Sequence, residues 1–104
     1  MDENTHEALN KLILAVKAFT RSVEKSFHLG MYYGAADLMI RQYNGLHSKA
    51  RQLLPDNFYI NELLILEVAK ETVEDEKVIA QIMLISEQLL DHLQNVVKTE
   101  QLYA

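Results

Sequence analysis

Glu24 and His28 are the side chains whose spacing best fits a shared metal ion, because residues four apart lie on one face of a helix. The other histidines do not extend this pair. His6 lies near the start of the chain, and His92 directly follows Asp91, so those two neighbours point in different directions. A di-iron helical bundle needs Glu-x-x-His on two helices, and neither copy is present. We therefore expect no metal site and no cofactor, and Glu24 and His28 remain the candidate ligands.

Arg41 and His47 form a second candidate pair, separated by five residues within one expected helix. The pair resembles the Arg and His signature of the HEPN nuclease families, which are also small helical bundles. The resemblance covers these two residues and implies RNA cleavage at a cleft between two copies of the chain. It departs from the family in that Gln42 follows the arginine and the motif lies mid-chain. The alternative interpretation is two solvated polar residues on an outer helix face.

Four carboxylates form a third candidate set. Glu71 and Glu74, followed by Glu87 and Asp91, resemble the acidic motifs of all-α nucleotide pyrophosphohydrolases. Those enzymes use such carboxylates to hold magnesium on a phosphate chain. Here the second pair is spaced one residue too widely, and the first pair straddles an expected break between helices. A magnesium-dependent enzyme is therefore an alternative hypothesis for the function of the chain.

Other chemistry is excluded by composition. The sequence contains no cysteine, which removes disulfides, thiolate metal sites and cysteine nucleophiles. There is no glycine-rich phosphate loop after a strand, and no serine lies in a nucleophile-elbow motif. No window of 18 uninterrupted apolar residues exists, so no membrane-spanning helix is expected. The polar, acidic first residues do not resemble a secretory signal, and we expect a cytoplasmic protein.

Apolar spacing and the scarcity of glycine and proline predict an all-α fold. The chain has 104 residues, 49% of them hydrophobic, with three glycines and one proline. That length fits a single domain over residues 1–104. Apolar residues recur at spacings of three and four, which is the pattern of amphipathic helices. The expected core positions of the first two helices are Leu9, Leu12, Val16, Phe19, Val23, Tyr32, Ala36, Met39, Tyr43, Leu46, Ala50 and Leu53.

Two breaks divide the chain into helices. We expect Asn4 to cap the first helix, with Glu7 reaching back to the cap, and Gly30 to end it. Gly34 and Gly45 lie within the second helix and permit a close helix approach there, or Gly34 marks a later start. Pro55 ends this second helix, because it pushes Leu54 out of helical geometry.

The second half of the chain predicts a short helix and a long one. Asp56 or Asn57 should cap the third helix, which we expect from Phe58 to about Glu71. With Thr72 as its cap, the fourth should run from 73 to about 98, and the tail at 99–104 should fray. At 1.5 Å per residue the third spans about 21 Å and the fourth about 40 Å, so the third covers only half of the fourth.

The expected fourth helix carries two adjacent apolar stripes, which is more than a helix in a monomeric bundle usually needs. We therefore expect a homodimer in which this helix meets a second copy of the chain. The alternative is that the first helix or the tail covers the second stripe. The predicted interface residues are Ile79, Met83, Leu90, Leu93 and Val97.

Charge is divided unevenly along the chain. Residues 1–54 contain seven Lys or Arg and five Asp or Glu, whereas residues 55–104 contain three and ten. Two solvated faces of opposite sign that attract each other explain this division, within the fold or across an oligomer. The net charge of −5 makes nucleic acid an unlikely partner, since that binding relies on several phosphate contacts.

The sequence thus predicts a four-helix antiparallel bundle with up-down-up-down topology, a short third helix and a dimeric state. No convergent cluster of polar residues stands out. We expect a small non-enzymatic interaction or regulatory protein that acts through a dimeric or partner-binding helix surface. The alternatives are the HEPN-like RNA-cleaving bundle and the magnesium-dependent pyrophosphohydrolase.

Overall fold

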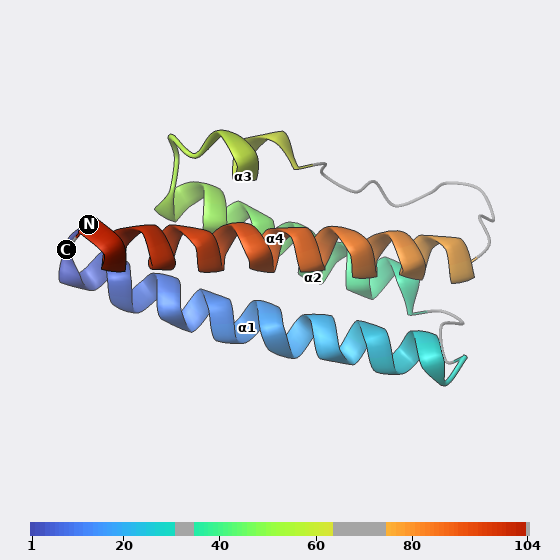
Figure 1. Cartoon of the computed structure of the whole chain (residues 1–104). Helices are drawn as coiled ribbons and strands as arrows, with labels where there is room; N and C mark the ends of the chain where they lie inside the picture. The colour runs from blue at the N-terminus through green and yellow to red at the C-terminus, as the bar shows by residue number, and fades with distance from the viewer. Residues whose placement is uncertain (31–34, 64–74, 104) are drawn as a thin grey trace.

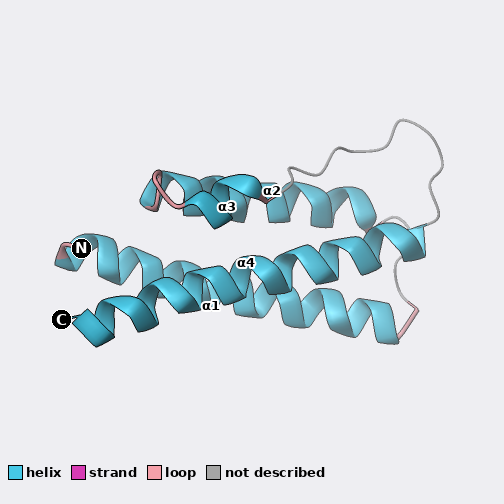
Figure 2. Cartoon of the chain, turned by 45° about the horizontal axis from the view of Figure 1, so that its top comes forward, coloured by secondary structure: helices cyan, strands magenta, loops and turns pink. Residues whose placement is uncertain are grey.

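Three long helices and one short helix make up the part of the chain that the structure describes. The computed structural model describes residues 1–30, 35–63 and 75–103. The helices are α1 (Glu3–His28), α2 (Ala36–Leu53), α3 (Phe58–Glu62) and α4 (Asp75–Tyr103). The described ranges contain no strand (Figure 2), so the prediction of an all-α chain with four helices is confirmed. Among these residues, no helix is both long enough and apolar enough to cross a membrane.

The three long helices lie side by side, and α3 lies across one side of them. α1 runs in the opposite direction to α2 and α4 (Figure 1). α3 contacts α2 and α4 but not α1. Both ends of the chain lie at the same end of the molecule, where the amino group of Met1 is 3.7 Å from the Glu100 carboxylate.

The core forms where the apolar stripes of α1, α2 and α4 meet. Leu9, Val16, Tyr43 and Leu89 have no exposed surface, and Ile60 of α3 joins them. Of the expected core positions, Tyr32 lies outside the described residues, and Met39, Leu46 and Leu53 are only partly buried against this core. The regular apolar spacing therefore predicts the buried faces of the helices correctly.

The start of α1 differs from the prediction. Asp2, not Asn4, caps the helix, and its Oδ1 accepts a hydrogen bond from the Thr5 amide at 2.7 Å. That bond lowers the pKa of the Asp2 carboxyl. Asn4 lies inside the first turn, because Asp2 supplies the same capping chemistry two residues earlier. At the other end, Gly30 has a φ of 68°, which confirms it as the residue that allows the helix to end.

α3 is much shorter than predicted. Asn57 caps it, with its side chain accepting from the Ile60 amide at 3.0 Å, and the helix ends at Glu62 because Leu63 has extended backbone angles. The expectation of a helix to Glu71 is therefore wrong as a continuous element. Residues 64–74, including the expected cap at Thr72, lie outside the described residues.

α4 is longer than predicted, since it continues to Tyr103 instead of ending near Lys98. Val96 and Val97 pack against the core, and Thr99 donates a hydrogen bond to the Asn95 carbonyl. These contacts and the ion pair of Glu100 hold the last turns in helical form.

A buried hydrogen bond attaches α3 to α2. The His47 side chain is 2% exposed, and its Nε2 lies 2.7 Å from the carbonyl oxygen of Ile60. A carbonyl oxygen only accepts, so Nε2 carries the proton and donates it. The imidazole also stacks on Tyr43, with ring centroids 5.8 Å apart. His47 is therefore part of the core rather than the outer face that the sequence suggested.

Replacing His47 by Phe should destabilise the protein by about 1–3 kcal/mol, because an aromatic ring remains while the buried Ile60 carbonyl loses its donor. The free energy of unfolding in urea measures this effect. His28→Phe is the matched control, since His28 is exposed at the end of α1. Equal stability of the two variants would show that the bond does not hold α3 in place.

Candidate functional site

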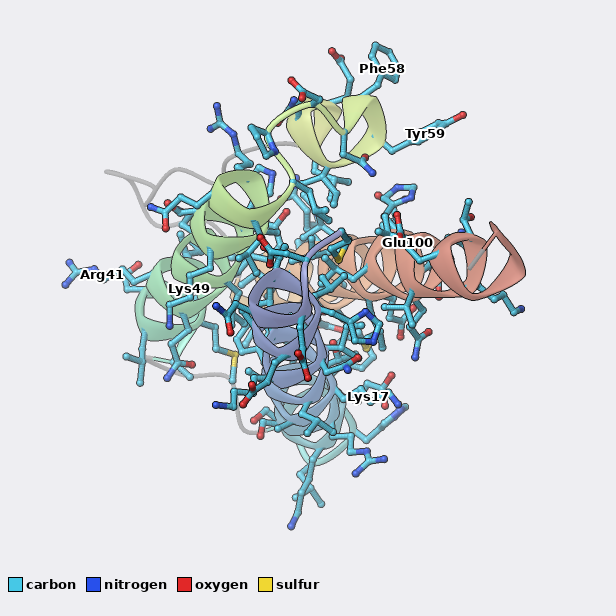
Figure 3. All side chains as sticks on the ribbon, turned by 90° about the vertical axis from the view of Figure 1, so that its left-hand side faces the viewer. Lys17, Arg41, Lys49, Phe58, Tyr59 and Glu100 are labelled. Atoms are coloured by element: carbon cyan, nitrogen blue, oxygen red, sulfur yellow. The ribbon has the colours of Figure 1, made fainter. Side chains whose placement is uncertain are left out.

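The structure does not bring Arg41 and His47 together. Arg41 extends from α2 on the side away from α4 (Figure 3), whereas His47 is buried against α3. The His47 Nε2 already donates to Ile60, so this nitrogen has no access to a substrate within one chain. These positions give no geometric support to the RNA-cleaving pair.

The candidate metal ligands lie one turn apart on α1, and no third ligand joins them among the described residues. Glu24 faces Glu87 of α4, and the two carboxyl groups share a hydrogen bond. His28 is exposed in the last turn of α1 and lies edge-on to Phe27. Within residues 1–30, 35–63 and 75–103, no group of three or more His, Asp or Glu residues is placed to hold a metal ion.

The acidic set is only partly described. Glu71 and Glu74 lie outside the described residues, while Glu87 and Asp91 lie on α4 next to α1. The hydrogen bond with Glu24 raises the pKa of Glu87 above its ordinary value of 4.5. Desolvation and the negative charges of Glu24 and Asp91 raise it further. Glu87 therefore interacts chiefly with another carboxyl group of the same chain.

The predicted interface residues on α4 fall into two groups. Ile79 and Leu93 have no exposed surface and belong to the core of a single chain. Met83, Leu90 and Val97 are partly buried and pack against the same core. In this fold only the latter three keep surface that a second copy could contact, because one chain already covers most of both stripes.

Three long helices create three outer grooves, and each groove has a different lining. α3 covers the groove between α2 and α4. The groove between α1 and α4 contains a cavity of about 660 Å³ lined by charges of both signs, among them Lys17, Asp91 and Lys98. The groove between α1 and α2 differs from both, because its floor is apolar and its charged residues are all basic.

Two adjoining cavities of about 410 and 330 Å³ form this α1–α2 groove, and both are lined by Leu46 and Lys49. Leu12, Phe19, Leu46 and Leu53 supply the apolar floor. The groove is hollow because small side chains line it: Ala8, Ala15, Ala18, Ser22 and Gly45.

Gly45 shows how open the groove is. A Cβ atom added at this position meets nothing within 4 Å. No other helix of the described chain comes within 4 Å of that Cβ position, so the prediction that Gly45 permits a close helix approach is wrong. A glycine inside a helix costs up to about 1 kcal/mol relative to alanine. This unexplained glycine, together with the small residues of α1, was the sequence signal that could have located the groove.

Three cations line the groove: Lys11, Arg41 and Lys49. Lys11 lies 3.3 Å from the Glu7 carboxylate one turn earlier, and this ion pair is exposed. Arg41 and Lys49 form no ion pair with a described residue. No Asp or Glu lines either cavity, although the whole chain carries a net charge of −5. The groove is therefore a basic surface on an acidic protein.

Exposed apolar side chains lie beside the groove and also on α3. Leu14 is 65% exposed and lies one turn from Ala18, while Leu38 is 60% exposed and lies one turn from Gln42. On the opposite side, Phe58 and Tyr59 extend outward from α3 (Figure 3). Tyr59 stacks on His92 of α4 with ring centroids 5.4 Å apart.

Replacing Glu87 by Gln should raise the melting temperature at pH 7 by roughly 1–3 °C and change it little at pH 4. The raised pKa of Glu87 means that the folded chain holds its proton more tightly than the unfolded chain. The stability that this pair contributes is therefore present below pH 4.5 and is lost as the pH rises through the raised pKa.

Thermal unfolding of Glu87→Gln, Glu24→Gln and the double variant at both pH values tests this prediction. Either single change removes the repulsion, so the double variant should gain nothing further. A melting temperature that falls at pH 7 in both single variants would contradict the repulsion.

Comparisons of the chain with known protein families, with curated proteins and with solved structures give no significant match. Function is therefore inferred from the geometry of the chain itself.

Proposed function

We propose that this chain is a small, non-enzymatic interaction protein that binds another protein through its helical surface. The observation that carries the proposal is the α1–α2 groove, which has an apolar floor in which Leu46 and Leu53 keep exposed surface beside the nearly buried Leu12 and Phe19. Concave apolar surface of this kind is typical of sites that bind ligands or partner helices.

The shape of the groove favours a protein partner over a small molecule. Its two cavities lie along the helices instead of forming one enclosed chamber, and both are open to solvent. An elongated partner can fill such a groove, whereas a small ligand would remain largely exposed to water in it.

Catalysis is the less supported alternative. An enzyme needs groups that converge on one reacting atom. Among the described residues, Arg41 and His47 lie on different sides of α2, and Glu87 interacts with Glu24. No observation favours either the nuclease hypothesis or the pyrophosphohydrolase hypothesis.

Self-association through α4 stays a prediction. Met83, Leu90 and Val97 lie along one edge of α4, and each is already partly buried within its own chain. The α1–α2 groove adds to its partly exposed apolar residues a hollow shape and charged residues that are all basic, so we place the main binding surface there.

Replacing Gly45 by Gln should stabilise the fold and abolish partner binding. The new side chain has open space around it, and glutamine favours a helix over glycine by about 0.5 kcal/mol or more. The same side chain fills the groove. Affinity capture from the native host, combined with thermal unfolding, measures both effects.

Ser48→Gln is the matched control, because Ser48 is exposed on α2 and lines neither cavity. A partner that binds the wild-type and Ser48→Gln proteins but not Gly45→Gln supports the proposal. Equal capture by all three proteins would place the binding surface elsewhere.

A further inference from the structure

We propose that the α1–α2 groove accepts a single amphipathic helix of a partner protein, with an apolar face flanked by Asp and Glu. This inference rests on the proposed function and specifies the chemistry of the partner. Shape, charge and the apolar edges of the groove each contribute to it.

The dimensions of the groove fit one helix. α1 and α2 are antiparallel neighbours, and the lining residues of α1 extend from Ala8 to Ser22. That length is about 21 Å at 1.5 Å per residue, or about four helical turns. The small side chains along this line allow a third helix to approach closely, since the distance between helix axes depends on the side chains at the contact.

The apolar residues of the groove lie where a docked helix needs them. The nearly buried Leu12 and Phe19 and the partly exposed Leu46 and Leu53 form the floor along the length of the groove. Leu14 and Leu38 lie near its two sides, and both are mostly exposed. A helix with apolar residues at i, i+3, i+4 and i+7 would cover the floor with its apolar face.

The charges that line the groove indicate which residues should flank the apolar face of the partner helix. Arg41 and Lys49 lie on the α2 side of the groove, and Lys11 lies on the α1 side (Figure 3 shows the two residues of α2). With no carboxylate among the lining residues, acidic flanks would be attracted on both sides, and basic flanks would be repelled. Electrostatic complementarity of this kind sets the choice of partner more than the total affinity.

Two other occupants fit less well. In a second copy of this chain, the acidic helix α4 has its apolar stripe buried, with Ile82 and Leu89 fully covered. RNA would gain contacts from three cations but would leave the apolar floor unused, and the groove contains no exposed aromatic ring on which a base could stack.

The test uses a labelled 18-residue helical peptide with a leucine face and glutamate flanks, and a matched peptide with lysine in place of each glutamate. Fluorescence anisotropy with the full chain should show the acidic peptide binding at least about tenfold more tightly than the basic one. Added salt should reduce this preference, because the cations on the rim are exposed to solvent.

The charge-reversed variant Arg41→Glu/Lys49→Glu should prefer the basic peptide, and Gly45→Gln should bind neither. Both charged residues are exposed, so melting temperatures should show that the double variant still folds. Equal binding of the two peptides, an unchanged preference after charge reversal, or no binding of the acidic peptide would overturn the proposal.

Further outcomes separate this inference from the proposed function. If Gly45→Gln releases a host protein but the acidic peptide does not bind, the interaction function stands and the acidic-helix partner is wrong. Concentration-dependent self-association lost in Gly45→Gln would make a second copy the occupant. RNA binding lost in Arg41→Glu/Lys49→Glu would make a nucleic acid the occupant, and either result would contradict the proposal.

Discussion

The buried hydrogen bond between His47 and the Ile60 carbonyl determines where α3 lies. It joins α3 to α2, and the fully buried Ile60 side chain anchors α3 in the core. Because a buried carbonyl without a donor is costly, α3 is held over the groove between α2 and α4. Among the described residues, α3 is the only short helix, and it lies against α2 and α4. It therefore does not cover the groove between α1 and α2.

The groove between α1 and α2 combines two properties that suit the binding of a partner. Its floor is apolar, and its charged residues are all cations on a chain whose net charge is negative. By contrast, the groove between α1 and α4 is lined by Lys17, Asp91 and Lys98, which balance one another in part. An apolar groove bordered by unbalanced charge is the kind of surface that gains most from a partner of opposite charge.

Much of the fold could be predicted from local sequence patterns. The spacing of residues such as Leu9, Leu12 and Val16 identified the buried faces, and Gly30 and Pro55 located the breaks between helices. The cap at Asp2 was missed because Asn4 has similar chemistry. The end of α3 was missed because the residues after Glu62 continue an apolar pattern that suits a helix.

The candidate site could not be found in the same way, because it depends on which helices become neighbours. The sequence pattern suggested His47 as a surface residue, but it is buried and bonded to α3. The pattern also suggested Ile79 and Leu93 as surplus apolar surface, but both are fully buried within a single chain. Arg41 and Lys49 can be identified as groove residues only when the small side chains of α1 are known to lie opposite them. The length and apolar pattern of a helix do not show which other helices will become its neighbours.

The position of a bound acidic peptide on the protein tests the central claim most directly. Titration of the isotope-labelled chain with this peptide, followed by amide NMR, should shift the signals of Ala18, Gly45 and Lys49, which line the groove. The signals of Tyr59 and His92 on the opposite side should remain unchanged. Shifts confined to Tyr59 and His92, with none along the groove, would contradict the account.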